Sequence, residues 1–324
     1  TATNNYNVAV GYSAGGAITT GTLNTLIGGL AGDALTSGNN NTAVGYLALS
    51  ADTLGDRNTA IGNSALAAQN FTTTTDSYNT AVGFTAGASI TTGTNNTIMG
   101  GLAGDALTDA DFNVALGYSA LTSDTLGSRS VAIGHSALNN QNFTTATDSL
   151  NTAVGFTAGQ AITTGVQNTL IGADAGDALT DSDYNTAVGY AALSSDTLGA
   201  RNTAIGHEAL ASQNFTTATD AYNTAVGMNA GRLVTTGTQN TLIGGLAGDA
   251  LTTGSQNVAL GYQALTSDDV GSDSVAIGKG TLQNQNFTTA TNSYNTAVGR
   301  DAGNDITTGV QNTFVGGLAG DATD

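Results

Sequence analysis

The pentapeptide Asn41-Thr42-Ala43-Val44-Gly45 recurs along this chain, identical or closely related in sequence, eighteen times. Successive copies begin 17, 17, 17 and then 21 residues apart, so a super-repeat of 72 residues underlies the sequence. Units this short and this regular are typical of solenoids, in which each unit contacts only its neighbours. The spacing of one pentapeptide therefore predicts the fold class.

Each unit is numbered here from the first residue of its pentapeptide, which is position 0. The first residues are Asn7, Asn24, Asn41, Asn58, Asn79, Asn96, Asn113, Ser130, Asn151, Asn168, Asn185, Asn202, Asn223, Asn240, Asn257, Ser274, Asn295 and Asn312. Position +1 is Thr or Val, position +3 is aliphatic and position +4 is always Gly. A period of two predicts a short strand with +1 and +3 facing inward, followed by a glycine turn.

Seventeen residues accommodate two strands of about five residues and two turns, with no room for a useful helix. The sequence therefore predicts an all-β fold, a parallel β-solenoid of the β-roll type with about 18 coils. We expect residues 1–324 to form one continuous domain and to be a segment of a longer fibre. The repeated Asn at position 0 predicts a ladder of side-chain hydrogen bonds from coil to coil.

Position +2 then faces outward, and it is Ala in three of the four kinds of unit. In the fourth kind it is larger, as in Leu26, Ile98 and Leu170. An outward apolar column predicts burial against another surface. We expect the partner to be another copy of the chain, in a trimer or a filament, with open strand edges as further contacts. The alternative is that the chain's own second sheet covers this column.

The composition excludes several classes of function. The chain has no Cys, and 24 acidic residues outnumber six basic ones, for a net charge of −18. Such a surface repels phosphate backbones and anionic lipids, so we expect no nucleic-acid partner. No apolar run reaches the length of a membrane-spanning helix, so we expect no membrane insertion. No set of residues suggests catalysis, and no cofactor is required.

Two groups of acidic residues are candidate calcium ligands. They are Asp105, Asp109 and Asp111 in one unit and Asp177, Asp181 and Asp183 in another. Closely spaced oxygen ligands in a turn suit Ca²⁺. The corresponding residues of other units are mostly Ser, Thr or Asn, so the fold does not depend on every site. Aspartates that only shape turns are the alternative interpretation.

The 21-residue unit contains an extra segment with the sequence Gln-Asn-Phe-Thr-Thr. Its asparagines are Asn70, Asn142, Asn214 and Asn286, each in an Asn-Phe-Thr pattern that matches the acceptor for N-glycosylation. A loop anchored on the rod by its Phe is the second interpretation, and contact with a ligand is the third.

Three further recurring positions have structural interpretations. Arg57 and its equivalents are expected to form exposed ion pairs with a neighbouring Asp. Tyr46 and its equivalents are expected to pack over the glycine turn. His135 and His207 share one position but stand four coils apart, so they cannot share a metal ion within one chain.

The octapeptide Ser130-Val131-Ala132-Ile133-Gly134-His135-Ser136-Ala137 and the related segment 274–278 resemble the head-domain repeat of trimeric autotransporter adhesins. Similar repeats occur in phage tail fibres and other secreted fibrous proteins. The resemblance implies a left-handed β-roll, association of three chains and binding to host surfaces. The coils of this chain are longer than the repeats of that family.

We therefore expect an extracellular structural or adhesive fibre segment, on a cell or virion surface, that associates with itself and displays surface loops. The alternative is an adhesin head or tail-fibre shaft that binds a receptor or a glycan. An ice-binding solenoid is disfavoured because Thr pairs such as Thr19-Thr20 and Thr91-Thr92 recur only once in four coils, and because the Thr at +1 is expected to face inward. A polysaccharide-processing enzyme is disfavoured because no groove of clustered charged residues is apparent.

Overall fold

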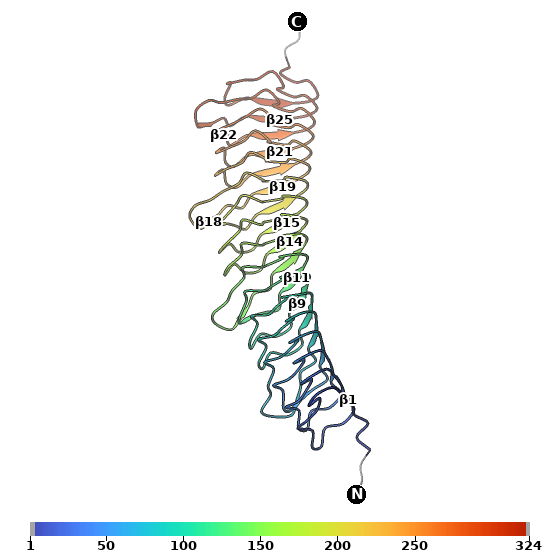
Figure 1. Ribbon diagram of the computed structural model, residues 1–324. Helices are drawn as coiled ribbons and strands as arrows, with labels where there is room; N and C mark the ends of the chain where they lie inside the picture. The colour runs from blue at the N-terminus through green and yellow to red at the C-terminus, as the bar shows by residue number, and fades with distance from the viewer. Residues whose placement is uncertain (1–3, 322–324) are drawn as a thin grey trace. The chain divides into compact units, whose positions relative to one another are not determined.

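The computed structural model describes residues 4–321, and within them it is all-β, with no helix. The chain is a parallel β-solenoid of about 18 turns, as the repeat predicts. It divides after Thr164 into two compact units, and each unit stacks its strands as successive parallel arrows (Figure 1). The expectation of a single continuous domain stays a prediction.

The main strands of the first unit are β1 (Val8–Val10), β2 (Thr25–Ile27), β3 (Thr42–Val44), β5 (Thr59–Ile61), β7 (Thr80–Val82), β8 (Thr97–Met99), β9 (Val114–Leu116), β11 (Val131–Ile133) and β13 (Thr152–Val154). Those of the second unit are β14 (Thr169–Ile171), β15 (Thr186–Val188), β17 (Thr203–Ile205), β19 (Thr224–Val226), β20 (Thr241–Ile243), β21 (Val258–Leu260), β23 (Val275–Ile277), β25 (Thr296–Val298) and β26 (Thr313–Val315). Every one of them covers positions +1 to +3 of its coil. Equivalent positions pair, as Thr42 does with Thr59 and Thr59 with Thr80, so the longer unit does not shift the register.

A second strand forms only where a 17-residue unit meets a 21-residue unit. These two-residue strands are β4 (Gly55–Asp56) with β6 (Thr75–Asp76), β10 (Gly127–Ser128) with β12 (Thr147–Asp148), β16 (Gly199–Ala200) with β18 (Thr219–Asp220), and β22 (Gly271–Ser272) with β24 (Thr291–Asn292). In the second unit they lie across the coil from the main strands (Figure 1). The prediction of two strands of about five residues in every coil was wrong, because most of each coil is turn.

The predicted orientation of the main strands was also wrong. Position +2 faces inward: Leu26, Ala43 and Ile98 are 0 % exposed. Positions +1 and +3 face outward, and the side chain of Ile61 is 38 % exposed. The apolar column expected to seek a partner is therefore the core of the solenoid itself.

The asparagine at position 0 explains this orientation. The Nδ2 group of Asn41 donates to the carbonyl of Gly55, 14 residues later in the same coil, at 2.9 Å. Its Oδ1 accepts the backbone N–H of Asn58 in the next coil, also at 2.9 Å. An amide that closes its own coil must point inward, and a period of two then places +2 inward and +1 and +3 outward. The predicted asparagine ladder is confirmed.

The side chains at positions +2 and +8 fill the core together, and a large side chain at one of them is accompanied by a small one at the other. Units with Leu at +2, such as Leu26, carry Gly at +8, and a Cβ on Gly32 would lie 2.8 Å from a methyl group of Leu26. Units with Ala at +2, such as Ala43, can instead carry Leu at +8, as in the fully buried Leu49. Compensating sizes keep a thin core densely packed.

Left-handed backbone conformations bend each coil. Positions −1, +6 and +8 all have positive φ, and at −1 the residues include Tyr78 at 50° and Arg57 at 63°. Such values are uncommon outside glycine. Residues as different as Tyr, Arg and Leu occupy them here, so no residue type revealed these corners in the sequence.

A buried chain of polar side chains supports each long loop. The carboxylate of Asp52 accepts hydrogen bonds from Gln69 Nε2 at 2.7 Å and from the backbone N–H of Gly55 at 3.0 Å. Gln69 Oε1 in turn accepts from Asn79 Nδ2 at 2.9 Å. Burial raises the pKa of Asp52 above its ordinary value of 3.8, although the hydrogen bond from Gln69 works in the opposite direction. Most other coils have an aliphatic residue at this inward position, +11.

Candidate functional site

The most distinctive surface is the outward side of the main strands, which we call the strand face. It consists of positions −1, +1, +3 and +5 of every coil. Burial alternates through this segment. In coils with a side chain at +5, positions −1 and +5 are nearly always exposed and +1 and +3 are half-buried or exposed, while positions 0 and +2 are buried in every such coil after the first. The segment thus presents four parallel columns of side chains to solvent.

Nearly all exposed large hydrophobic side chains of the described chain belong to the strand face. Among residues 4–321 the exceptions are Val310 and Leu318. The +3 column supplies Val, Ile, Leu and Met, and the +1 column supplies Thr and Val. On each of the two compact units, an apolar surface of this kind is unusual for a soluble monomer and marks a contact site.

Acidic residues are almost absent from the strand face, whereas most of the basic residues lie on it. Five of the six basic residues lie on the strand face, and the sixth, Arg232, does not. The five are Arg57, Arg129, Arg201, Lys279 and Arg300. Of the acidic residues that the structure describes, Asp273 alone belongs to the strand face. The net charge of −18 is therefore carried by the other sides of the coils.

Stacked rings form the border of the strand face at position +5. The ring centroids of Tyr118 and His135 lie 5.3 Å apart, and those of His135 and Phe156 lie 5.4 Å apart. Where +5 is glycine, the ring of the next coil covers it: a Cβ on Gly29 would lie 3.5 Å from Tyr46. Tyrosine was expected to pack over the turn glycine itself; the half-exposed ring of Tyr46 instead lies beside Gly29, the residue after the turn glycine of the preceding coil.

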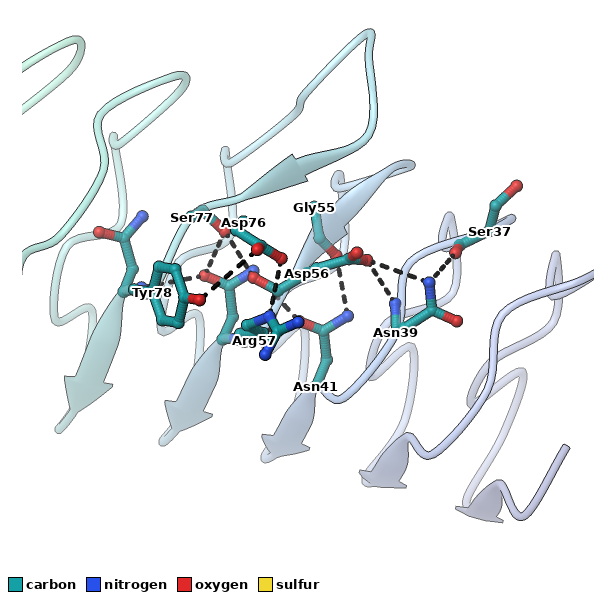
Figure 2. A network of polar contacts seen from close by, with 11 residues as sticks. Ser37, Asn39, Asn41, Gly55, Asp56, Arg57, Asp76, Ser77 and Tyr78 are labelled. Atoms are coloured by element: carbon teal, nitrogen blue, oxygen red, sulfur yellow. Dashed lines mark hydrogen bonds and ion pairs between the residues drawn. The ribbon is translucent and has the colours of Figure 1, made fainter.

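Arginine and aromatic side chains form the other border, at position −1. Arg57 Nε donates to Asp76 Oδ1 at 2.7 Å, and its guanidinium lies 5.6 Å from the centre of the Tyr78 ring (Figure 2). Asp76 is the principal reason that the pKa of Arg57 is raised further. Arg129 pairs with Asp148 and Arg201 with Asp220, both at 3.0 Å. The predicted ion pairs are confirmed.

The candidate calcium ligands bond to neighbouring coils. Asp109 Oδ1 accepts from Thr92 Oγ1 at 2.6 Å, and Asp111 Oδ1 accepts from the N–H of Thr94 at 2.6 Å. Asp105 accepts from Thr122. In the second group, Asp183 Oδ1 accepts from the N–H of Val166 at 2.8 Å, and burial raises the pKa of Asp177.

No preformed metal site results from this arrangement. Within residues 4–321, no three Asp, Glu, His or Cys side chains gather closely enough to hold a metal ion. The calcium interpretation stays a prediction without a preassembled site.

The four long loops are anchored as the second interpretation of the sequence proposed. Phe71 is 5 % exposed, and Phe143, Phe215 and Phe287 are buried to the same degree. The N–H of Phe71 donates to the Asp52 carboxylate at 3.3 Å. This buried chain of Asp, Gln and Asn was missed in the sequence. Its signal was the change from an aliphatic residue to Asp and then Gln at position +11 of consecutive coils.

The described surface contains no pocket, so the candidate site is an open face. Within residues 4–321, no helix is long and apolar enough to cross a membrane. In comparisons with known proteins, no family model matches the chain, and no curated protein is similar to it. The likeness to adhesin and phage-fibre repeats therefore rests on the quoted motifs alone.

Proposed function

We propose that the protein is a structural fibre segment whose strand face binds the strand face of another copy, in the extracellular space or on a cell or virion surface. The observation that carries this proposal is the concentration of exposed large hydrophobic side chains in four columns of one face. Removing such columns from water stabilises an assembly in proportion to the apolar area buried.

A second copy is the partner that fits the columns best. Parallel strands repeat at about 4.8 Å, so two copies present the same spacing, and a contact made at one coil recurs along the unit. The acidic sides of two copies repel one another, whereas the strand face has almost no carboxylates. Association through this face leaves the long loops, which lie outside the four columns, free for display.

The test compares equal charge changes on and off the strand face. Leu116→Lys and Ile205→Lys each place a cation in the +3 column, one in the first compact unit and one in the second. Thr73→Lys and Thr145→Lys each place a cation in an exposed long loop. Light scattering and electron microscopy should show that the wild type and the loop variants form oligomers or fibres. The strand-face variants should remain monomeric, with unchanged circular dichroism.

Two outcomes would refute the proposal. One is a wild-type chain that stays monomeric at micromolar concentration. The other is equal assembly by the strand-face variants and the loop variants. The size of the particles distinguishes a discrete trimeric rod from a long fibre.

Ice binding is a second candidate, because the Thr at +1, expected to face inward, faces outward. The Thr at +1 faces outward, in a column beside the aliphatic +3 residues, and Thr97 is exposed. The strand face around this column is nearly free of carboxylates, although Val replaces Thr at +1 in five coils. Inhibition of ice recrystallisation at low protein concentration, lost in Thr42→Lys and Thr97→Lys, would support ice binding; absence of inhibition would exclude it.

A further inference from the structure

The asparagine of each long loop is exposed, and in three of the four loops its side-chain oxygen is bonded while its side-chain nitrogen is free. Asn70 holds its backbone by donating its N–H to the carbonyl of Thr91 at 2.9 Å. Its Oδ1 accepts a hydrogen bond from Thr53 Oγ1 at 3.1 Å. Within residues 4–321 its Nδ2 donates to no protein group, and the same holds for Asn142 and Asn214. The amide nitrogen thus faces solvent while the oxygen is fixed.

The threonine two residues later has no structural role in the described chain. Thr72 is exposed, and no hydrogen bond to another described residue involves it; Thr144, Thr216 and Thr288 are equivalent. Not every exposed position of the same loop is retained: Thr74 is replaced by Ala146 and Ala218 in other copies, although the exposed Thr73 recurs. The fold therefore accounts for the buried Phe between the two residues but not for the retained Thr.

The fourth copy separates the asparagine from its hydrogen-bond partner. The residue equivalent to Thr53 is Asp269, a carboxylate that cannot donate to an amide oxygen when ionised. Asn286 is nevertheless present and exposed, followed by Phe287 and Thr288. The Asn-Phe-Thr pattern persists where the contact made by its Asn has been lost.

We propose that Asn70, Asn142, Asn214 and Asn286 carry N-linked glycans. In this reaction the amide nitrogen attacks the anomeric carbon of a lipid-linked oligosaccharide diphosphate. A C–N bond forms, the C–O bond to the diphosphate breaks, and the lipid diphosphate leaves as the amide loses one proton. The hydroxyl of the Thr two residues later completes the acceptor pattern.

Glycans at these four loops would be displayed at regular intervals. One long loop occurs in every four coils, so neighbouring glycans within a unit stand about 19 Å apart along the stack. The loops lie outside the four columns of the strand face. The proposal therefore stands independently of self-association.

The test is peptide mass spectrometry of the protein purified from the cells that produce it, before and after treatment with an amidase that releases N-glycans. The release converts a modified Asn to Asp, which the peptide mass reports. We expect all four Asn-Phe-Thr peptides to be modified, and the same chain made in a cytoplasm without the glycosyl donor to be unmodified. Unmodified Asn70, Asn142, Asn214 and Asn286 in the native protein would overturn the proposal.

Two matched variants test the role of the threonine hydroxyl. Thr72→Ser keeps the acceptor pattern and should retain the glycan on Asn70, whereas Thr72→Val has the same shape and should lose it. Because Thr72 is exposed and makes no hydrogen bond to another described residue, both variants should fold, as circular dichroism would verify. Equal modification of the two variants would refute the proposal.

The same spectra keep this proposal separate from that of self-association. Asn40 and Asn95 also match the acceptor pattern, but they lie at position −1 of the strand face. Glycans found there would contradict association through the strand face and leave the four loops unaffected.

Discussion

The strand side of each coil, positions −1 to +5, and its loop side, the remaining positions, are stabilised in different ways. On the strand side every unit repeats the same seven positions, and Asn, Thr and Gly recur with little change. On the loop side the units differ in length, and buried Asp52 and Gln69 replace aliphatic core residues and bond to Asn79 of the strand side. The comparison shows where backbone pairing is sufficient and where side chains must hold the chain.

The difference has a physical origin. Strands in register satisfy their backbone groups through the ladder, so small inward residues such as Ala43 and Ala60 are sufficient there. The long loop lacks such a ladder along most of its length. A buried carboxylate with three donors supplies the missing acceptors, at the expense of a desolvated charge.

The largest expected effect comes from the turn glycine on the strand side. Gly28 has φ of 135°, and a Cβ there would collide with the carbonyl oxygen of Gly45. Gly28→Ala should lower the free energy of unfolding by roughly 3 kcal/mol or more, because both the backbone angle and the contact are incompatible with a side chain. Denaturation followed by circular dichroism measures this effect.

Its neighbour is the control for that prediction. Gly29 has no restrictive φ, and an added Cβ would make an ordinary contact with the Tyr46 ring at 3.5 Å. Gly29→Ala should change stability by less than about 0.5 kcal/mol. Equal losses in the two variants would show that the turn does not require glycine.

The strand side was largely predictable from the sequence. Strict spacing identifies coils, pairing and register, since a solenoid keeps Thr42 beside Thr59, and Thr59 beside Thr80, through steps of unequal length. The inward and outward faces were assigned wrongly because Thr and Val at +1 beside an aliphatic +3 look like a core pattern. The buried Asn at position 0 was the better guide to orientation.

The loop side was less predictable. The residue types of Tyr78 and Arg57 do not predict their positive φ, because the geometry of the closed coil imposes this backbone conformation. Asp52 and Gln69 are distant in sequence and become informative only when units are aligned at +11. The strand face itself emerged only after the orientation was known.

The second prediction tests the corrected orientation. Ala60 is fully buried at +2, and Thr59 next to it faces outward. Ala60→Leu should lower the free energy of unfolding by about 1–3 kcal/mol through overpacking, whereas Thr59→Val should change it by less than about 0.5 kcal/mol. Thermal unfolding of both variants provides the measurement. If Thr59→Val lowered the free energy of unfolding more than Ala60→Leu does, positions +1 and +3 would have to face inward and this orientation would be wrong.

The smallest expected effect concerns the donor to the buried carboxylate on the loop side. Gln69→Met keeps the length of the side chain but removes the hydrogen bond to Asp52. At neutral pH it should lower the free energy of unfolding by about 1 kcal/mol, the typical net value of a buried hydrogen bond. Gln256→Met removes the same group from an exposed position, where its hydrogen bond to Gln239 competes with water, and in the monomer it should change the free energy of unfolding by less than about 0.5 kcal/mol.

The pH dependence identifies the charge state that Gln69 stabilises. Its N–H favours the ionised carboxylate, so its contribution is present above the folded pKa of Asp52 and is lost as pH falls through that pKa. Because burial raises this pKa above 3.8, the difference between wild type and Gln69→Met should shrink at less acidic pH than an ordinary Asp would allow. The burial of the Asp52 carboxyl group has the opposite pH dependence. Because the folded pKa lies above 3.8, this group contributes most to the free energy of unfolding below pH 3.8, and the contribution is lost as pH rises through the folded pKa. Unfolding curves of both proteins between neutral and acidic pH decide the matter, since a difference independent of pH would reduce Gln69 to a packing residue.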